Sequence, residues 1–385
     1  MRITHLWLDY SPNLFDRSHP LCLSHGLDSE VVCEAFIENG AAQLPGTFLV
    51  RQRSPAEMNT TSIPGRLVSR LRRPVDHARF ARLTRRRTQA ARPDVLHVHF
   101  GTTAAVLEER GALPDLPTVV SFYGVDISES LQVPEILRAY RSIFAKAAIL
   151  HVLCDEAQRR LVRAGCPPEK IRIGNLPVSL EEIPDIGVEA TGTTRFLIPA
   201  RFVEKKGHRV LLTAFKRLVD GGLPVSLTCF GYGPAAWLQR FVADLGLGGS
   251  VRIVDNGQTG AFMAEYVRVL REHDVVLAPS VRSRSGDDEA GPALTLVMAQ
   301  AAGKPVIVSN FPGSERSVVD GEHGVVVPAG DAGGLHDAMA GVAGDVARWE
   351  RFGRAGRRLA LEKFSDAAYW ANLLAWYRSA AQARS

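Results

Sequence analysis

Short apolar runs alternate with helical stretches along this chain, and they do so in two series. The runs of the first series cover residues 3–8, 95–100, 118–124 and 148–154, and those of the second cover residues 195–200, 224–231, 274–280 and 304–310. Strands that alternate with helices predict parallel sheets covered by helices. The sequence therefore predicts the α/β class, with two Rossmann-like domains facing each other across a central cleft.

The segment between the two series is rich in proline, glycine, threonine and acidic residues, which is typical of a linker. We expect an N-terminal domain over residues 1–180, a linker over 181–193 and a C-terminal domain over 194–364. Residues 365–385 are expected to form a final helix. A length of 385 residues suits two domains of this kind.

The positive charge of the chain is concentrated in one segment. Lysine and arginine exceed aspartate and glutamate by 46 to 41, which gives a net charge of +5. Residues 51–92 hold 12 arginines against only Glu57 and Asp76, so this segment carries +10 and the remainder −5. This balance speaks against a nucleic-acid binder. It predicts that residues 51–92 face an anionic acceptor or an anionic membrane leaflet, the alternative being a pair of solvated helices.

Cysteine usage and the first residues predict a cytoplasmic protein. The five cysteines show neither CxxC spacing nor a His-Cys zinc pattern, so we expect reduced thiols and no metal. Asp9 interrupts the first apolar run before the core of a signal peptide could form. No run approaches the roughly 20 apolar residues of a membrane span.

The first candidate site is the segment ARFVEKKGH, residues 200–208, between a strand and a helix. A helix N-terminus offers free N–H groups, Arg201 a forked donor and Lys206 a point charge. Together these groups are suited to a diphosphate. The alternative interpretation is a solvated basic turn.

The second candidate site is the turn CFGYGPA, residues 229–235. Gly231 and Gly233 permit a close backbone approach, and with Ala236 they fit the pattern GxGxxA, while Asp255 ends a later strand. This pattern is similar to a dinucleotide fingerprint, so an NAD-dependent oxidoreductase is an alternative function. A plain tight turn explains the same residues.

The third candidate site begins with the acidic run before Gly291 and Pro292. The helix that follows has an apolar face that includes Met298, and its N-terminus with Glu289 is suited to phosphate oxygens and sugar hydroxyls. The alternative is an acidic first turn that only complements the helix dipole.

The fourth candidate site is SFYGVDIS, residues 121–128, with Tyr123 and Asp126 around a glycine. His97 and His99 alternate on a nearby strand and therefore point to the same face of the sheet. Hydrogen-bonded core histidines are the alternative interpretation. The absence of a Ser-His-Asp order, HExxH and a P-loop speaks against triad hydrolases, zinc proteases and kinases.

Taken together, these motifs resemble family 4 of the retaining glycosyltransferases, which have the GT-B fold, and in particular enzymes of bacterial exopolysaccharide synthesis. The segments that carry the resemblance, in the family's order, are DVLHVHFG, AKAAILHVLCDEAQRRLVRAGCPPEKIRIGNLPV, RFVEKKGHRVLLTAFKRL, FGYGPAAWLQRFVADLGLGGSVRI, HDVVLAPS, AQAAGKPVIVS and VVDGEHGVVVPAGD. In this family the final helix crosses back to the first domain.

The resemblance implies transfer of a sugar from a UDP-, GDP- or dTDP-sugar to a hydroxyl acceptor, with retention of configuration. It implies no cofactor or metal, since cations and helix N-termini stabilise the leaving diphosphate. The residues it assigns are Tyr123, Asp126, Arg201 and Lys206 for catalysis; Arg201, Lys206, Gly231, Gly233, Glu289, Gly291, Pro292 and Met298 for the donor; and His97, His99 and Gly101 on the acceptor side.

The chain departs from the family pattern in both domains. Tyr123 stands where the family has a histidine near the donor sugar. The family's two glutamates fall at Ala290 and Met298, with Glu289 one residue from the first, and a later family glutamate falls at Arg316. These departures leave a second hypothesis open, in which the chain is a binding or partner subunit without transferase activity of its own.

Overall fold

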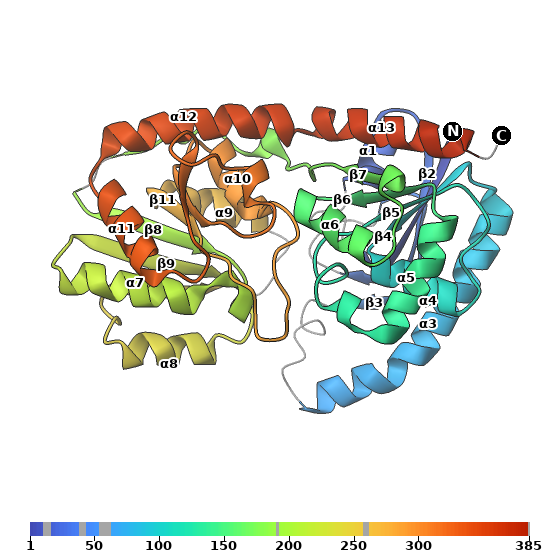
Figure 1. Cartoon of the computed structure of the whole chain (residues 1–385), viewed down its shortest axis with the longest axis horizontal. Coiled ribbons are helices and arrows are strands. Elements are labelled where there is room, and N and C mark those ends of the chain that lie inside the picture. Colours follow the sequence, from blue (N-terminus) through green and yellow to red (C-terminus); the bar gives the residue numbers. More distant parts are fainter. Residues whose placement is uncertain (11–16, 38–43, 54–62, 190–191, 257–261, 384–385) are drawn as a thin grey trace. The chain divides into compact units, whose positions relative to one another are not determined.

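The structure, a computed structural model, describes residues 1–10, 17–37, 44–53, 63–189, 192–256 and 262–383. It divides into two compact units (Figure 1). The first contains Met1–Gly174 and Asp366–Ser385, and the second contains Asn175–Ser365.

The first unit contains a parallel sheet of seven strands in the order β3-β2-β1-β4-β5-β6-β7. The strands are β1 (Arg2–Tyr10), β2 (Asp28–Ile37), β3 (Thr47–Arg53), β4 (Val95–His99), β5 (Thr118–Ser121), β6 (Ile149–Val152) and β7 (Ile171–Ile173). The helices are α1 (Ser18–Ser24), α3 (Ile63–Ala91), α4 (Gly101–Glu109), α5 (Pro134–Lys146), α6 (Asp155–Arg163) and α13 (Asp366–Gln382).

The last helix, α13, packs within the first unit although it follows the whole second unit in sequence (Figure 1, dark red). It contacts α1, β4 and β5. Its buried face carries Tyr369, Leu373, Trp376 and Tyr377. A hydrogen bond between Ser18 Oγ and Tyr369 Oη of 2.8 Å fixes it to α1. The sequence prediction of a final helix that returns to the first domain agrees with this packing.

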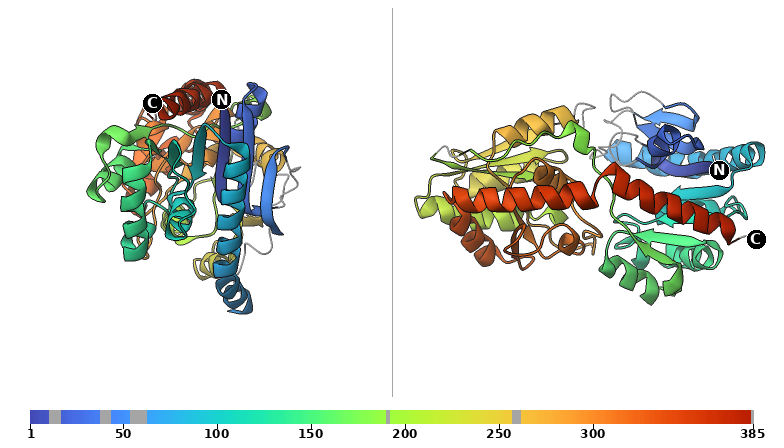
Figure 2. Two further views of the ribbon diagram at one scale, coloured as in Figure 1. Left: turned by 90° about the vertical axis from the view of Figure 1, so that its right-hand side faces the viewer. Right: turned by 90° about the horizontal axis from the view of Figure 1, so that it is seen from above.

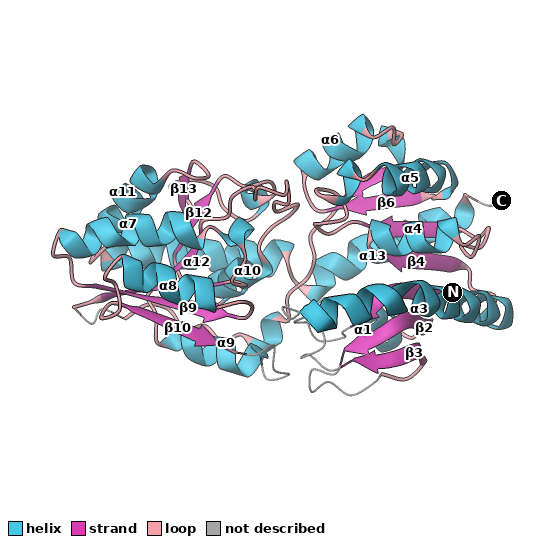
Figure 3. Cartoon of the chain, turned by 90° about the horizontal axis from the view of Figure 1, so that it is seen from below, coloured by secondary structure: helices cyan, strands magenta, loops and turns pink. Residues whose placement is uncertain are grey.

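The second unit contains a parallel sheet of six strands in the order β10-β9-β8-β11-β12-β13 (Figure 3). The strands are β8 (Thr194–Pro199), β9 (Val225–Gly231), β10 (Val251–Asp255), β11 (Val275–Ala278), β12 (Val306–Ser309) and β13 (Gly324–Val327). The helices are α7 (His208–Asp220), α8 (Ala236–Asp244), α9 (Phe262–Arg271), α10 (Leu294–Ala301), α11 (Ala332–Val342) and α12 (Val346–Lys363).

Helices cover both faces of this second sheet (Figure 2). Successive residues of a strand point to opposite faces, so Phe196 and Ile198 enter one apolar cluster while Leu197 enters the other. One cluster includes residues of α7, α8 and α11, and the other includes residues of α9, α10 and α12. The near-continuous apolar strands of the sequence thus reflect burial on both faces.

The boundary between the units lies after Gly174, earlier than the end expected at residue 180. Val178 and Ile183, from the expected end of the first domain and the linker, are buried in the core of the second unit. These two apolar side chains therefore attach the proline-rich segment to the second unit.

Candidate functional site

In the second unit, a sharp turn places two lysines beside the end of β11. Gly207 has a φ of +74°, and a Cβ at this position would lie 1.8 Å from the carbonyl oxygen of Pro279. Only glycine fits such a contact with this backbone conformation. The approach brings the short 3₁₀ turn η4 (Glu204–Lys206), which holds Lys205 and Lys206, against residues 279–292.

Lys206 forms an ion pair with Glu289. Its Nζ lies 2.5 Å from Glu289 Oε1, which also accepts a hydrogen bond of 3.0 Å from Ser280 Oγ. Both side chains of the ion pair are mostly buried, at 18% and 12% exposure. Burial raises the pKa of the Glu289 carboxyl, but the positive charges of Lys206 and Lys205 and the two hydrogen bonds outweigh it and hold the pKa below its usual value.

Lys205, which is not among the site residues predicted from the sequence, is buried and contacts the segment of residues 279–292 as well. Its Nζ donates to Asp287 Oδ1 and to the carbonyl oxygen of Asp288, both at 3.1 Å. Its own carbonyl accepts from the N–H of Val281 at 2.8 Å. Lys205, Lys206, Asp287 and Glu289 are called the lysine clasp below.

A small pocket opens beside Lys206, at the carboxyl ends of β8 and β11. Ligands in open parallel sheets bind at this end of the strands. Its lining residues are Ile198, Pro199, Ala200, Lys206, Leu277, Ala278, Ser280, Ala293, Thr295 and Leu296. Thr295 at the start of α10 is fixed by a hydrogen bond from its Oγ1 to the carbonyl oxygen of Pro199, at 2.9 Å. The pocket is therefore lined by the ammonium group of Lys206 and by the side-chain hydroxyls of Ser280 and Thr295, which come from two other segments.

Arg201, predicted beside Lys206, is exposed, and no hydrogen bond or ion pair within the described residues holds its side chain. Gly231 ends β9 against the start of this turn, where a Cβ would lie 2.1 Å from the carbonyl oxygen of Ala200. Gly233 has a φ of +124°, which favours glycine. The two predicted glycines therefore allow the β9 turn to approach the segment that carries Arg201.

The segment before α10 is packed through glycine. A Cβ on Gly313 would lie 2.4 Å from the backbone of Gly291, and Gly291 and Pro292 are buried. Met298, predicted at the donor site, packs against the apolar cluster of the second unit. At the later family glutamate, Arg316 instead donates to Asn175 Oδ1 at 2.7 Å.

In the first unit, Asp126 is fully buried and joins two backbone segments. Its carboxylate accepts hydrogen bonds from the N–H groups of Gly101 at 2.9 Å, Gly124 at 2.8 Å and Tyr123 at 3.1 Å. Burial raises the pKa of this carboxyl, and the N–H donors oppose that effect. Gly101 begins α4, and a Cβ there would lie 2.1 Å from the ring of Phe122. Asp126 thereby fixes Tyr123 relative to α4.

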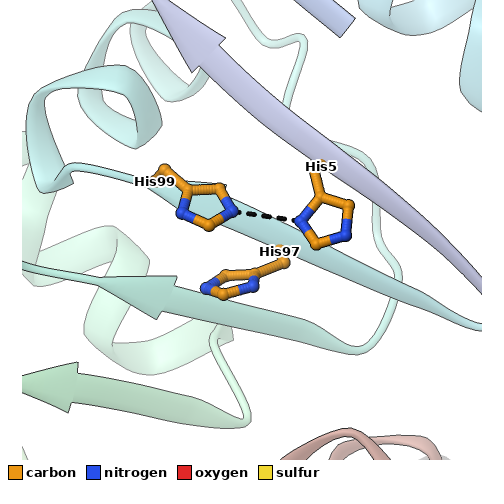
Figure 4. Close-up of side chains that lie close together, drawn as sticks. All are labelled: His5, His97 and His99. Atoms are coloured by element: carbon orange, nitrogen blue, oxygen red, sulfur yellow. Dashed lines mark hydrogen bonds between the residues drawn. The ribbon is translucent and has the colours of Figure 1, made fainter. Parts of the chain in front are cut away.

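His97 and His99 lie in a buried layer of imidazoles together with His5 of β1 (Figure 4). His5 Nδ1 lies 3.1 Å from His99 Nε2, and His99 Nδ1 lies 2.7 Å from the half-buried hydroxyl of Tyr123. His5, His97, His99, Ser121 and His151 are called the histidine layer below. Direct contact of His97 or His99 with an acceptor stays a prediction, and the burial of both rings argues against it.

One end of the histidine layer fixes the direction of its hydrogen bonds. His151 Nε2 lies 3.2 Å from the carbonyl oxygen of Gly174, so this nitrogen donates. With uncharged rings, Ser121 Oγ then donates to His151 Nδ1 at 2.9 Å, and His97 Nε2 donates to Ser121 Oγ at 2.8 Å. His97 Nδ1 is left to accept from the Tyr377 hydroxyl at 2.7 Å.

The described part of α3 carries a basic face within the arginine-rich segment, of which residues 54–62 lie outside the described residues. The exposed arginines of this face are Arg79, Arg82, Arg85 and Arg86. The opposite face buries Phe80, Thr84 and Thr88 against the sheet. Among the described residues, we find no helix with the length and apolar character required to cross a membrane.

Two family models match the chain, one for each series of strands. The model described as glycosyl transferase 4-like domain matches residues 23–175. The model described as glycosyl transferases group 1 matches residues 193–345. The matched ranges contain the histidine layer from His97 to His151 and the whole lysine clasp.

Two of the curated relatives are named for colanic acid and amylovoran biosynthesis. The chain is 31% identical over 253 residues to WcaL of Salmonella typhimurium, named for colanic acid biosynthesis, a match that covers 64% of this chain and 61% of that protein. It is 31% identical over 246 residues to the amylovoran biosynthesis glycosyltransferase AmsK of Erwinia amylovora, covering 63% and 59%. The match therefore spans about three fifths of the length of these relatives.

Solved structures share the fold over nearly the whole chain. Sucrose-phosphate synthase from Thermosynechococcus elongatus superposes with a TM-score of 0.77 at 16% identity and covers 98% of each chain. HepE of Anabaena, solved with UDP and glucose, gives a TM-score of 0.67 at 14% identity and covers 100% of this chain and 99% of that one. The chain belongs to the glycosyltransferases with a 4-like and a group 1 domain, and its fold is GT-B.

Proposed function

We propose that the chain transfers a sugar from a nucleotide diphosphate sugar to a hydroxyl of a growing saccharide or lipid-linked acceptor, with retention of configuration. The observation that carries this proposal is the lysine clasp, with Lys206 at the carboxyl ends of two strands, beside a pocket lined by Ser280 and Thr295. A cation in this position suits the diphosphate of a donor.

In the proposed reaction, the bond between the anomeric carbon and the diphosphate oxygen breaks, and a bond forms from that carbon to the acceptor oxygen. The leaving diphosphate gains negative charge, which Lys206 and Arg201 stabilise. The proton of the acceptor hydroxyl passes to an oxygen of the leaving phosphate. This route asks for no buried acid and base pair, since the leaving group itself takes the proton.

Glu289 is proposed to hold Lys206 in place until the donor arrives. Its carboxylate neutralises the lysine at 2.5 Å, and a phosphate oxygen would offer the same kind of partner. Exchange of one anion for another keeps the lysine paired, while Glu289 keeps the hydrogen bond from Ser280 Oγ and the nearby positive charge of Lys205. We infer that Asp126 is a positioning residue for Tyr123, because its carboxylate accepts hydrogen bonds from backbone N–H groups.

The first experiment is a thermal-shift panel with UDP, GDP, dTDP, ADP and NAD, because a ligand that binds the native state raises its apparent stability. We expect one of the nucleoside diphosphates to stabilise the protein, and UDP is tested first because HepE was solved with it. Stabilisation by NAD alone would favour the oxidoreductase alternative of Gly231, Gly233 and Asp255 and overturn the proposal.

A matched pair of lysine variants locates the site. Lys206→Ala is expected to weaken binding of the stabilising nucleotide by roughly 10- to 100-fold, the range of a charge-assisted hydrogen bond. Lys216→Ala serves as the control, since Lys216 lies on α7 and pairs only with Asp220 among the described residues. Equal affinity in the two variants would move the diphosphate away from the lysine clasp.

A second candidate function, a binding subunit without transfer, is favoured by Met298, a partly buried apolar side chain at the position where the family resemblance places a glutamate. The two functions separate in one assay, in which the nucleotide identified by the panel is offered as its matched sugar nucleotides with an extract of acceptors. Binding without release of the nucleoside diphosphate supports the subunit. Release that requires the acceptor supports the transferase.

We also propose that the basic face of α3 lies on the anionic inner surface of the cytoplasmic membrane, where a lipid-linked acceptor would be found. Each arginine near such a surface contributes about 1 kcal/mol. Arg82→Gln with Arg86→Gln should therefore weaken binding to vesicles containing phosphatidylserine, while Arg159→Gln on α6 should not. Binding that ignores the phosphatidylserine content would contradict this placement.

A further inference from the structure

We propose that His5, His97 and His99 form a binding site for one borderline transition-metal ion, of which Zn²⁺ is the type. One ligand nitrogen from each ring lies within 4.8 Å of the other two, and all three residues are buried. Figure 4 shows the three rings gathered on one face of β1 and β4. The sheet itself brings them together, because His5 lies directly opposite His97 in the register of these two strands.

Burial of all three rings favours the uncharged imidazole, which is the form that binds metals. Burial lowers the pKa of each imidazole well below 6.5, and the neighbouring histidines lower it further. A neutral imidazole has one nitrogen that carries a proton and one with a free electron pair, which is the ligand. No proton therefore has to leave a charged ring before an ion binds.

The second nitrogen of each ring already has an outer partner, as in known metal sites, where the other N–H of a ligand histidine is held by an oxygen. Tyr123 Oη lies 2.7 Å from His99 Nδ1, and Ser121 Oγ lies 2.8 Å from His97 Nε2. For His5, the nearest partner is the thiol of Cys22, with Sγ at 3.9 Å from Nε2.

These outer partners leave three nitrogens to face the ion. The hydrogen bonds that end at Gly174 assign the electron pair of His97 to Nδ1. His5 Nδ1 and His99 Nε2 share a single proton across 3.1 Å. The ion would take the place of that proton, which moves to the outer nitrogen of the same ring, so that both rings stay neutral and each carries one outer hydrogen.

Binding of an ion requires a small movement of the ligand rings. Zinc–nitrogen bonds of about 2.0–2.1 Å at tetrahedral angles place ligand nitrogens roughly 3.4 Å apart. The pair from His5 and His99 already meets this spacing, so His97 has to approach them. The hydroxyl of Tyr377, 2.7 Å from His97 Nδ1, is positioned to become an oxygen ligand, and as a phenolate it would offset part of the charge of the ion.

The donor set selects the ion and its role. Nitrogen ligands favour Zn²⁺, Cu²⁺ or Co²⁺ over Mg²⁺ and Ca²⁺, which prefer oxygen. Three histidines and a phenol in the core leave no open coordination position for a substrate, which is typical of a structural site. The ion would join β1 and β4 and, through Tyr377, helix α13. Its role is separate from the proposed glycosyl transfer.

The test uses the untagged full chain after treatment with a chelator. The protein is incubated with Zn²⁺ or Co²⁺, passed through a desalting column and analysed for metal content and for the visible spectrum of bound Co²⁺. We expect one ion per chain, a tetrahedral Co²⁺ spectrum and a rise in melting temperature. Folded protein that retains no ion, or that shows only an octahedral Co²⁺ spectrum, overturns the proposal.

Three variants separate this site from other buried histidines. His5→Gln and His97→Gln should each weaken retention of the ion by more than about 100-fold, and Ser121→Ala, which removes an outer partner, by roughly 10- to 100-fold. His19→Gln is the matched control, because His19 is buried beside His5 but bonds to Ser29 and Pro45. If His97→Gln does not fold, His5→Gln decides, and retention equal to that of His19→Gln overturns the proposal.

Discussion

The histidine layer and the lysine clasp both lie on parallel sheets, but they satisfy their polar groups in opposite ways. The histidine layer is buried, and its hydrogen bonds join its own members, two tyrosine hydroxyls and a backbone carbonyl. The lysine clasp is charged and partly exposed, and it borders a pocket. A neutral network of this kind holds parts of the fold in position, whereas a charged pair at a pocket can exchange one partner for a ligand.

The largest expected effect tests the lysine clasp. Lys206→Ala removes the cation proposed to stabilise the leaving diphosphate, so we expect sugar transfer to fall by about 10²–10³-fold. The measurement is kcat/KM with the sugar nucleotide that the ligand panel identifies. If Lys206→Ala and the control Lys216→Ala transfer equally well, the lysine clasp is a structural ion pair and the contrast with the histidine layer disappears.

The next effect tests whether Asp126 belongs with the positioning groups. Asp126→Ala leaves three backbone N–H groups without their acceptor in a buried site, and we expect a loss of about 3 kcal/mol in the free energy of unfolding. Urea denaturation measures this loss. Asp94→Ala, which removes a single acceptor from the exposed N–H of Arg2, is the milder control.

A different result would reclassify Asp126. If Asp126→Ala kept its stability and lost only sugar transfer, this carboxylate would act on the substrate rather than on the backbone. It would then be a catalytic residue, as the family resemblance implies, and the first unit would contribute a charged group to the reaction.

The third prediction concerns how the stability of the protein depends on pH through His208, at the start of α7. Burial lowers the pKa of this imidazole to about 3, and the positive charge of Lys206 makes a smaller contribution in the same direction. Neither ring nitrogen has a hydrogen-bond partner within the described residues. The unfolded chain takes up a proton at pH 6.5 and the folded chain only near pH 3, so this residue removes stability as the pH falls through that window.

His208→Leu should therefore make the protein less sensitive to acid. Between pH 6.5 and pH 5, the imidazole accounts for a loss of about 2 kcal/mol, and the variant should avoid that loss. Urea denaturation of both proteins at pH 7 and pH 5 gives the comparison. Equal losses in the two proteins would mean that His208 has a partner in solution or titrates normally.

The sequence predicts the strands and the turns of this fold because both have local causes. Near-continuous apolar runs form strands that are buried on both faces, and Gly207, Gly231 and Gly233 occur in turns where another segment of the backbone approaches closely. The prediction that Lys206 binds the donor rests on its place between a strand and a helix. Hydrogen-bonded core histidines are one of the two interpretations of His97 and His99 from the sequence, and the structure buries both rings.

Long-range contacts explain what the sequence left out. His5 joins His97 only because β1 pairs with β4, which are about 90 residues apart in the chain. Lys205 and Lys206 are adjacent, and only the path of residues 279–292 decides that one meets Asp287 and the other Glu289. The sequence prediction puts Val178 in the first domain and Ile183 in the linker, because local composition does not show which core an apolar side chain enters.

The smallest expected effect concerns a hydrogen bond of the uncharged histidine layer. Tyr377→Phe removes a hydroxyl that borders the histidine layer and leaves His97 Nδ1 without its donor. Because both partners are uncharged, we expect a loss of only about 1 kcal/mol in the free energy of unfolding, measured by urea denaturation without metal. A loss several times larger would show that the layer acts as one cooperative network that fastens α13 to the sheet. No measurable loss would show that the carbonyl end at Gly174 holds the layer in place without α13.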